Sequence, residues 1–405
     1  MSIWIRRVTT ALKYLVLSGV TGVVFLVAWL GIEHVTQTSL PQPTGPFAVG
    51  RSVDHWVDEA GVDTLAPVAG TKRELLVWAW YPATPGSAPV DDYLPAALRP
   101  ANQGGTNIWT FLTRDASKVR GHSLRNASVA EAGGLFPVIV LRGGGSSGVL
   151  NYSSLAEDLA SHGYVVVGFD APYRTGLVVF PDGRALGRTE DNNPERCLPL
   201  AHTEQERCAA RLIDASTADT AFVLDRLAQL NASVSGTFSN RLDMSRVGLF
   251  GHSFGGAAIA EFCRVDPRCR VGVDIDGAPH GAVIAAGLRQ PFMFLLSDHR
   301  RDADPESRQI KADIQSIYDH LPADGRLALE ISGAFHFMFS DDGAVRKSSM
   351  VRGAVRLLGR LEMNARRQLA ITSYCLRAFF DAHLKGLDAP PAIPSAEYPE
   401  LQRLR

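Results

Sequence analysis

The chain of 405 residues lacks several features that mark specialised proteins. Its 41 basic residues are balanced by 42 acidic ones, so it has no excess positive charge of the kind that binds nucleic acids. It contains no CxxC or HxxxH spacing for a zinc site and no GxxxxGK[ST] loop for a nucleotide. We therefore expect no nucleic-acid partner, no nucleotide, no metal and no cofactor.

Cysteine is also scarce, with five residues in the chain. With 46% hydrophobic and 20% charged residues, the composition is that of an ordinary globular protein and not of a disordered or disulfide-dense one. Cys197 and Cys208 share one loop-like stretch, Cys263 and Cys269 flank a short turn, and Cys375 is left over. In an exported protein we predict the disulfides Cys197–Cys208 and Cys263–Cys269, with buried free thiols as the alternative.

Export is suggested by one long apolar run. Residues 14–32 (YLVLSGVTGVVFLVAWLGI) carry no charge, and a helix of that length spans about 28 Å, close to the hydrocarbon thickness of a bilayer. Arg6, Arg7 and Lys13 precede the run, which predicts a cytoplasmic N-terminus and an extracytoplasmic remainder, periplasmic or extracellular. We predict a retained signal anchor. A cleaved signal peptide with a secreted product, or a buried core helix, is the alternative.

The remaining sequence predicts one large α/β domain over residues 47–405, preceded by a proline-containing extended tether over residues 33–46. Short continuous apolar runs alternate with helical patterns, which indicates a mostly parallel, doubly wound sheet with helices on both faces. Insertions at about 83–133 and 171–205 are long enough to wall a binding pocket. We predict strands at 75–81, 138–141, 165–169, 247–250, 271–275, 292–296 and 327–331, and helices at 152–161, 205–229, 255–263 and 308–320.

The sequence GHSFGG at 251–256 follows one predicted strand and opens a small-residue helix. This context is that of a nucleophile elbow, the sharp strand-to-helix turn of α/β hydrolases, with Ser253 as nucleophile. Gly251 and Gly255 flank the serine because a side chain there would collide with the neighbouring strand or helix. His252, adjacent in sequence, is expected to point away and pack.

A serine nucleophile needs a base, and the base needs an acid, in the chain order Ser, Asp or Glu, His. Of the five histidines after Ser253, only His336 lies in a glycine-containing loop just after the last predicted strand, so we predict it as the general base. Asp276 and Asp298 each end a predicted strand, and either position suits the acid, although the pattern alone slightly favours Asp298. Asp274 lies within its strand and is expected to be structural.

Two backbone amides are expected to stabilise the oxyanion of the tetrahedral intermediate. One belongs to Phe254, the residue after the nucleophile. The other is expected from the glycine-rich loop RGGGSSG at 142–148, whose backbone can turn its amides inward. A flexible linker loop is the alternative interpretation of that stretch.

Five motifs in this order resemble the platelet-activating factor acetylhydrolase-like branch of serine α/β hydrolases, over about residues 45–342. They are VWAWYP at 77–82, RGGG at 142–145, GHSFGG at 251–256, DPRCRVGVDIDG at 266–277 and GAFHF at 333–337. By position, the resemblance implies Asp276 as the acid, with Asp298 as the alternative, and Gly144 as the second oxyanion donor. At the position where relatives often have histidine, this chain has Arg142. Its side chain is expected either to contact an anionic headgroup or to form an ion pair at the surface.

The resemblance further implies a calcium-independent esterase that acts on short or oxidised sn-2 acyl chains of phospholipids and uses no cofactor. The residues themselves indicate serine acyl hydrolysis through an acyl-enzyme. A general carboxylesterase or lipase, or an acyltransferase that uses the same chemistry, is the first alternative. A non-catalytic, membrane-anchored module on the same fold is the second.

Overall fold

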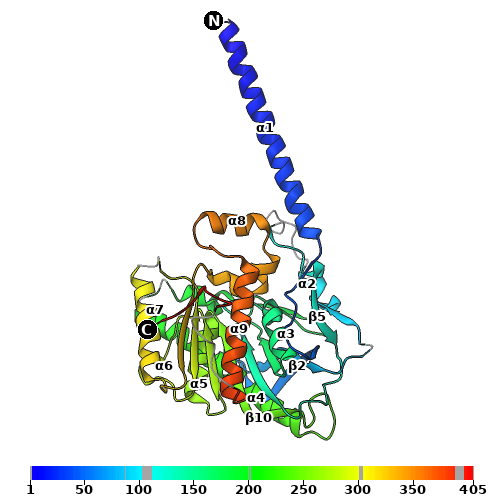
Figure 1. The fold of residues 1–405 in the computed structure, drawn as a ribbon, viewed down its shortest axis with the longest axis vertical. Helices are drawn as coiled ribbons and strands as arrows, with labels where there is room; N and C mark the ends of the chain where they lie inside the picture. The colour runs from blue at the N-terminus through cyan, green and yellow to red at the C-terminus, as the bar shows by residue number, and fades with distance from the viewer. Residues whose placement is uncertain are drawn as a thin grey trace.

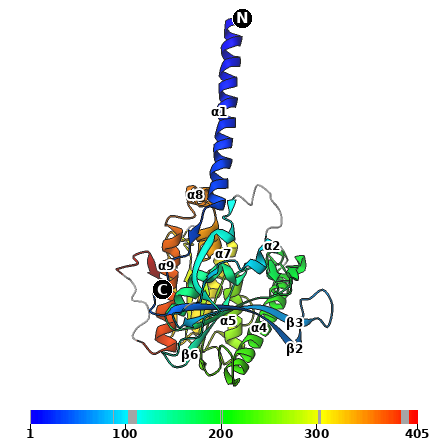
Figure 2. The same ribbon diagram turned by 90° about the vertical axis from the view of Figure 1, so that its right-hand side faces the viewer.

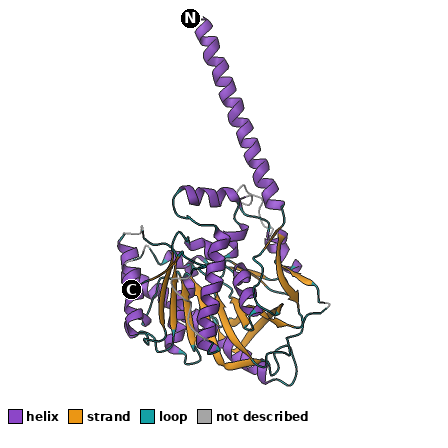
Figure 3. Cartoon of the chain, in the orientation of Figure 1, coloured by secondary structure: helices purple, strands orange, loops and turns teal. Residues whose placement is uncertain are grey.

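The computed structural model describes residues 2–86, 88–102, 112–198, 200, 202–300, 304–387 and 396–404. One long helix projects from an α/β domain that holds a strand layer between helices (Figures 1 and 3). The helices are α1 (Ser2–Val35), α2 (Arg99–Asn102), α3 (Ser153–Ser161), α4 (His202–Ala232), α5 (Phe254–Val265), α6 (Val283–Ala286), α7 (Pro305–His320), α8 (Ser349–Leu357) and α9 (Ala365–Leu384).

A sheet of 12 strands within the described residues forms the centre of the domain. Its order is β1-β5-β2-β3-β7-β6-β10-β11-β12-β13-β14, and β4 pairs with β5. The strands are β1 (Thr38–Ser39), β2 (Ala48–Val62), β3 (Lys72–Ala83), β4 (Val90–Asp92), β5 (Val119–Arg125), β6 (Phe136–Arg142), β7 (Val165–Asp170), β10 (Leu242–His252), β11 (Val271–Ile275), β12 (Phe292–Leu296), β13 (Arg326–Ile331) and β14 (Leu401–Arg403). Strands β8 (Leu177–Val179) and β9 (Ala185–Gly187) form a separate hairpin.

The six central strands, β7, β6 and β10 to β13, are mutually parallel. They are apolar on both faces, as in β11 and β12, because helices cover both sides of the sheet. Helices α3 and α9 pack on one face and α4 to α7 on the other, each over its own hydrophobic core. This arrangement confirms the predicted doubly wound α/β fold and brings the carboxyl ends of the parallel strands to one edge.

All seven predicted strands and all four predicted helices are present, with most of their bounds within three residues of the predicted ones. Within its described residues, the insertion at 83–133 lines a cavity of about 710 Å³ that does not include Ser253. It contributes β4 and β5 to the sheet edge, where β5 pairs with β1 and β2. The sequence did not predict β2, which is long and only partly buried, or helix α8, whereas the helical pattern around His383 corresponds to α9.

Helix α1 is long and apolar enough to cross a membrane, and it extends away from the domain in both views (Figures 1 and 2). The segment predicted as an extended tether, residues 33–46, is helical as far as Val35 and then lies against the domain. Thr38 and Ser39 pair with β5, and Leu40 is buried. The prolines leave the chain extended, but the apolar side chain and the edge of β5 hold it against the domain.

Candidate active site

Ser253 stands between β10 and α5 in a strained backbone conformation. Its φ is +56°, which is rare for a residue with a side chain. A Cβ on Gly251 would lie 2.3 Å from the carbonyl of Gly255, and one on Gly255 would lie 2.5 Å from the Gly143 oxygen. Only glycine fits at these two positions, so the local geometry has the features of a nucleophile elbow.

His336 and Asp276 come from neighbouring loops at the same edge of the sheet. The Nδ1 atom of His336 lies 2.8 Å from Oδ2 of Asp276. Asp276 follows β11 directly and, like Ser253, has a positive φ of +54°. Its carboxylate is almost fully buried, with the side chain 1% exposed, whereas that of His336 is 30% exposed. The arrangement holds one imidazole at a cavity wall and fixes which of its nitrogens carries a proton.

The Asp276 carboxylate has two further partners. Nε2 of His299 lies 2.7 Å from Oδ1, and Ser297 donates its backbone N–H to Oδ1 and its hydroxyl to Oδ2, at 2.8 and 2.6 Å. Burial by itself would raise the pKa of Asp276, but the hydrogen bonds from His299 and His336 outweigh it and hold the pKa well below its ordinary value. Asp276 is therefore a fixed anion.

Asp298, the alternative acid, has different partners. It accepts hydrogen bonds from the Arg300 side chain and, at 2.8 Å, from the backbone N–H of Gly333. The Arg300 hydrogen bonds lower its pKa below the ordinary value. Gly333 begins the loop that carries His336, so Asp298 fixes the start of that loop and does not contact the imidazole.

The two predicted oxyanion amides differ in their surroundings. Phe254 is the first residue of α5, where a backbone N–H has no helical carbonyl to bond. The Gly144 N–H, in contrast, donates to the Tyr152 hydroxyl at 3.0 Å. In this structure the Gly144 amide is thus engaged away from the nucleophile, whereas the sequence predicted a free donor.

A cavity of about 570 Å³ joins these groups. Ser253 and His336 both line it, together with the glycine-rich loop, Phe254 and Phe337. The insertion at 171–205 contributes five lining residues, which are Pro194, Glu195, Cys197, Leu198 and Gln205. Within the described residues, this insertion walls the cavity and the one at 83–133 does not, because β4 and β5 lie at the sheet edge.

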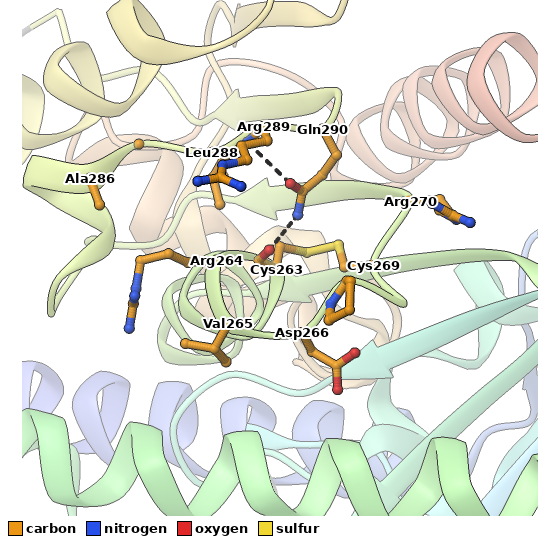
Figure 4. A pocket seen from close by; sticks show the side chains of 12 residues that line it. Cys263, Arg264, Val265, Asp266, Cys269, Arg270, Ala286, Leu288, Arg289 and Gln290 are labelled. Atoms are coloured by element: carbon orange, nitrogen blue, oxygen red, sulfur yellow. Dashed lines mark hydrogen bonds between the residues drawn. A yellow bond between two sulfur atoms is a disulfide. The ribbon is translucent and has the colours of Figure 1, made fainter.

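Both predicted disulfides are present. Cys197–Cys208 ties the cavity wall to α4, and its sulfur atoms pack beside Leu212 and Phe254. Cys263–Cys269 joins the end of α5 to the following turn and lines a different cavity, of about 590 Å³ (Figure 4). That cavity begins at Cys263 near the other end of α5, about 14 Å along the helix from Phe254. Cys375 is a buried free thiol.

Arg142 has neither of the two predicted roles. Its guanidinium lies 4.0 Å from the centre of the Phe169 ring and donates to the Phe169 carbonyl at 2.9 Å. Burial lowers the pKa of Arg142 to about 10. It lines a small cavity of about 30 Å³ behind the oxyanion loop, and not the cavity of Ser253. The side chain therefore braces β6 against β7.

The described residues contain no group of three or more His, Cys, Asp or Glu side chains that could hold a metal ion. The remaining histidines after Ser253 are dispersed. His320 ends α7, His383 packs on Phe379 in α9, and His280 lines the catalytic cavity. Sequence reasoning missed His299 and Tyr152. His299 was detectable, because it follows the carboxyl end of β12 by three residues.

The comparisons with known proteins agree with the predicted family. Residues 220–389, which include Ser253, Asp276 and His336, match the family model "Platelet-activating factor acetylhydrolase, isoform II". A probable 1-alkyl-2-acetylglycerophosphocholine esterase from Arthroderma benhamiae is 26% identical over 89% of this chain and 92% of its own. A platelet-activating factor acetylhydrolase from Cavia porcellus is 23% identical over 84% of this chain and 73% of its own.

A solved structure supports the same conclusion. The ferulic acid esterase from Streptomyces cinnamoneus superposes with a TM-score of 0.71 and 27% identity, over 91% of this chain and all of its own. Together with the sequence relatives, it confirms the predicted enzyme class, an ester hydrolase with an α/β-hydrolase fold, and the predicted resemblance to the acetylhydrolase family.

Proposed function

We propose that this chain is a membrane-anchored serine esterase that removes short or oxidised sn-2 acyl groups from phospholipids through the triad Ser253, His336 and Asp276. The observation that carries the proposal is the 2.8 Å bond between His336 Nδ1 and buried Asp276, at a cavity that also holds Ser253 on an elbow. Similarity to an alkylacetylglycerophosphocholine esterase supports the substrate class.

The triad would work as follows. Asp276 accepts the Nδ1 proton of His336, which leaves Nε2 free to take the Ser253 proton as the hydroxyl attacks the ester carbonyl. His336 then returns that proton to the leaving alcohol, and an acyl-enzyme remains. Water attacks the acyl-enzyme with His336 again as base, which releases the fatty acid.

The cavity suits an acyl group of limited length next to a polar leaving group. Leu198, Phe254 and Phe337 supply apolar surface, whereas Glu195 and Lys347 supply charge of both signs. The amine of Lys347 lies 3.2 Å from Asp342 at the rim. A zwitterionic headgroup can therefore meet an opposite charge for each of its own.

The anchor and the cavity lie at the same end of the domain. Lys347, which lines the cavity, donates to the Thr113 hydroxyl at 3.4 Å, and the Thr113 carbonyl is 2.6 Å from Nδ1 of His34 at the end of α1. Helix α8 lies beside the same end (Figure 1), where Ser349 donates to the Glu33 carboxylate at 2.8 Å. The cavity is thus carried close to any membrane that holds α1.

Helix α8 presents an exposed apolar end on this side. Leu357 is 91% and Leu358 76% exposed, and arginines flank them along the helix. Apolar side chains with basic neighbours suit a helix that rests in the lipid headgroup region. From the position of α8 we infer that the mouth of the cavity lies at the bilayer surface. A phospholipid could then enter the cavity from the membrane without crossing bulk water.

The nucleophile is tested by labelling the detergent-solubilised full-length chain with a fluorophosphonate. We expect one modified residue, Ser253, and complete loss of labelling in Ser253→Ala. Labelling of that variant at an unchanged rate would refute the assignment.

The substrate class is tested with a panel of esters at equal concentration. It contains short-acyl phospholipids, long-acyl phospholipids, feruloyl esters and simple water-soluble esters. We expect short-acyl phospholipids to have the highest kcat/KM. Preference for feruloyl or simple esters would leave the triad in place and overturn the lipid assignment, in favour of the activity named for the Streptomyces cinnamoneus structure.

A further inference from the structure

Three hydrogen bonds in series run along the wall of the catalytic cavity, beside the nucleophile elbow. The Gly144 amide lies 3.0 Å from the Tyr152 hydroxyl, which lies 2.8 Å from Nδ1 of His252. Nε2 of His252 lies 3.0 Å from the carbonyl oxygen of His336. The series therefore joins the glycine-rich loop, the elbow and the backbone of the residue that carries the base.

The direction of every bond in the series is determined. A carbonyl oxygen can only accept, so Nε2 of His252 must carry the proton that it shares with His336. Burial, with a smaller effect from His336, lowers the pKa of His252 to about 3, so the ring is neutral and Nδ1 accepts from Tyr152. The Tyr152 oxygen in turn accepts from the Gly144 N–H.

The two side chains of this hydrogen-bonded series, Tyr152 and His252, are shielded from water. Tyr152 is 1% and His252 5% exposed, and the His252 ring packs against the rings of His336 and Phe339. A buried polar group that loses its partner in such a place cannot turn to solvent. The series therefore resists rearrangement during a catalytic cycle.

This arrangement leaves the next amide available for the oxyanion. The Gly144 carbonyl accepts from the Ser147 N–H at 2.7 Å. In a trans peptide the following N–H, that of Gly145, points opposite to that carbonyl. Among the described residues no hydrogen bond involves the Gly145 N–H, and both Gly145 and Phe254 line the catalytic cavity. The φ of Gly145 is +48°, a conformation that glycine adopts readily.

We propose that Tyr152 and His252 are positioning residues that lock the oxyanion loop and the His336 loop to the elbow, and that the second oxyanion donor is consequently the Gly145 amide and not the Gly144 amide. The proposal rests on the proposed serine ester hydrolysis. It differs from the position implied by the family resemblance by one residue, and it gives the histidine before the nucleophile a role beyond packing.

The donor is identified by a crystal structure of the full-length chain in detergent after reaction with a fluorophosphonate. The phosphoryl oxygen on Ser253 stands where the oxyanion forms. We expect it within about 3.1 Å of the amide nitrogens of Phe254 and Gly145, with the Gly144 amide still bonded to Tyr152. An oxygen bonded to the Gly144 amide, with Tyr152 released, or one bonded to Phe254 alone, would overturn the inference.

The positioning role is tested with Tyr152→Phe and a matched control, Tyr164→Phe. Tyr164 also has a buried ring and its hydroxyl donates to Asp381 at 2.7 Å, but it directly precedes the amino end of β7 and does not line the catalytic cavity. We expect Tyr152→Phe to lower kcat about tenfold with KM within about twofold, because the lost bond fixes groups used in the transition state. Tyr164→Phe should keep kcat, while both variants lose a similar amount of thermal stability.

Different results would contradict the positioning role, the choice of oxyanion donor and the proposed function. An unchanged or higher kcat in Tyr152→Phe, or an equal fall in both variants, would reject the positioning role. If Tyr152→Phe does not fold, the structure of the phosphonylated wild-type chain still decides which amide donates. Failure of Ser253 to react at all would instead refute the proposed function.

Discussion

Nε2 of His299 lies 2.7 Å from Oδ1 of Asp276, on the carboxylate oxygen that His336 does not use. The buried acid is thus held between two imidazoles, one from the loop after β13 and one from the loop after β12. Since a carboxylate that accepts several hydrogen bonds resists both rotation and protonation, we propose that His299 fixes the orientation of Asp276, the proposed acid, toward His336, the proposed base.

Loss of His299 should therefore weaken catalysis without removing it. We expect His299→Ala to lower kcat about tenfold, as a charge-assisted hydrogen bond to Asp276 is lost. His299→Gln, whose amide can donate to the same oxygen, should recover most of this loss. Steady-state kinetics on one short-acyl ester give the comparison, and equal rates for the wild type and His299→Ala would show that the second imidazole has no part in positioning the acid.

The two candidate acids predict opposite rankings of their variants. Asp276→Asn should lower kcat by roughly 10⁴-fold, because the amide favours the wrong tautomer of His336. Asp298→Asn should cost far less, since its side-chain oxygen can still accept from the Gly333 amide. A larger loss in Asp298→Asn would transfer the role of the acid to that residue.

Asp274 makes the stability of the domain depend on pH. It is fully buried below the elbow, accepts from the Gly277 amide at 2.8 Å and has no partner for Oδ2, and burial raises its pKa to about 8. Between pH 4 and pH 8 the unfolded chain loses this proton and the folded chain keeps it, so the contribution of this group to stability falls as the pH rises through this range.

Asp274→Asn removes that dependence, because the amide is neutral at every pH. We expect the difference in Tm between variant and wild type to grow in favour of the variant from pH 5 to pH 8. Asp324→Asn, on an exposed turn, serves as the control and should show no such trend. Parallel Tm curves for Asp274→Asn and the wild type would mean that the carboxyl group is ionised in the folded chain.

The two disulfides should have separable effects. Replacing Cys197 and Cys208 by alanine frees the cavity wall near Leu198, so we expect activity on longer acyl chains to rise relative to short ones. The matched double variant at Cys263 and Cys269, at the far end of α5, should lose stability and keep the acyl preference. The same change in preference in both variants would refute the role of the Cys197–Cys208 bond in the wall.

The anchor is tested by the fate of the N-terminus. With a tag before Met1, we expect tag and domain to remain in one chain that alkaline carbonate does not extract from membranes. Release of a domain without the tag would show cleavage, in favour of the secreted alternative.

The central sheet and the elbow were predictable because their signals are local. Continuous apolar runs mark β6, β7 and β10 to β13, and the strand-to-helix turn at Ser253 requires glycines at fixed neighbouring positions. The alternatives for the acid could not be separated in this way, since Asp276 and Asp298 occupy equivalent positions in successive strand ends.

Contacts between distant segments explain what sequence reasoning missed. Tyr152 has no motif of its own, and its bond to Gly144 depends on how α3 packs beneath the glycine-rich loop. In the same way, residues 36–46 have the composition of a free linker, yet they lie against β5 and α3 because partners from elsewhere in the chain meet them.

The contacts between the end of α1 and the domain limit where the active site can reach. The end of α1 is bonded to the domain, with the Glu33 carbonyl accepting from Arg114 at 2.8 Å and the His34 carbonyl accepting from the Asp115 amide at 3.0 Å. If α1 stays in a membrane as proposed, these bonds would limit how far the domain can swing, and the active site would stay at a nearly constant height above the bilayer. It would find substrate by sliding sideways with the lipids of one leaflet, and its rate would follow the surface density of substrate and not its concentration in solution.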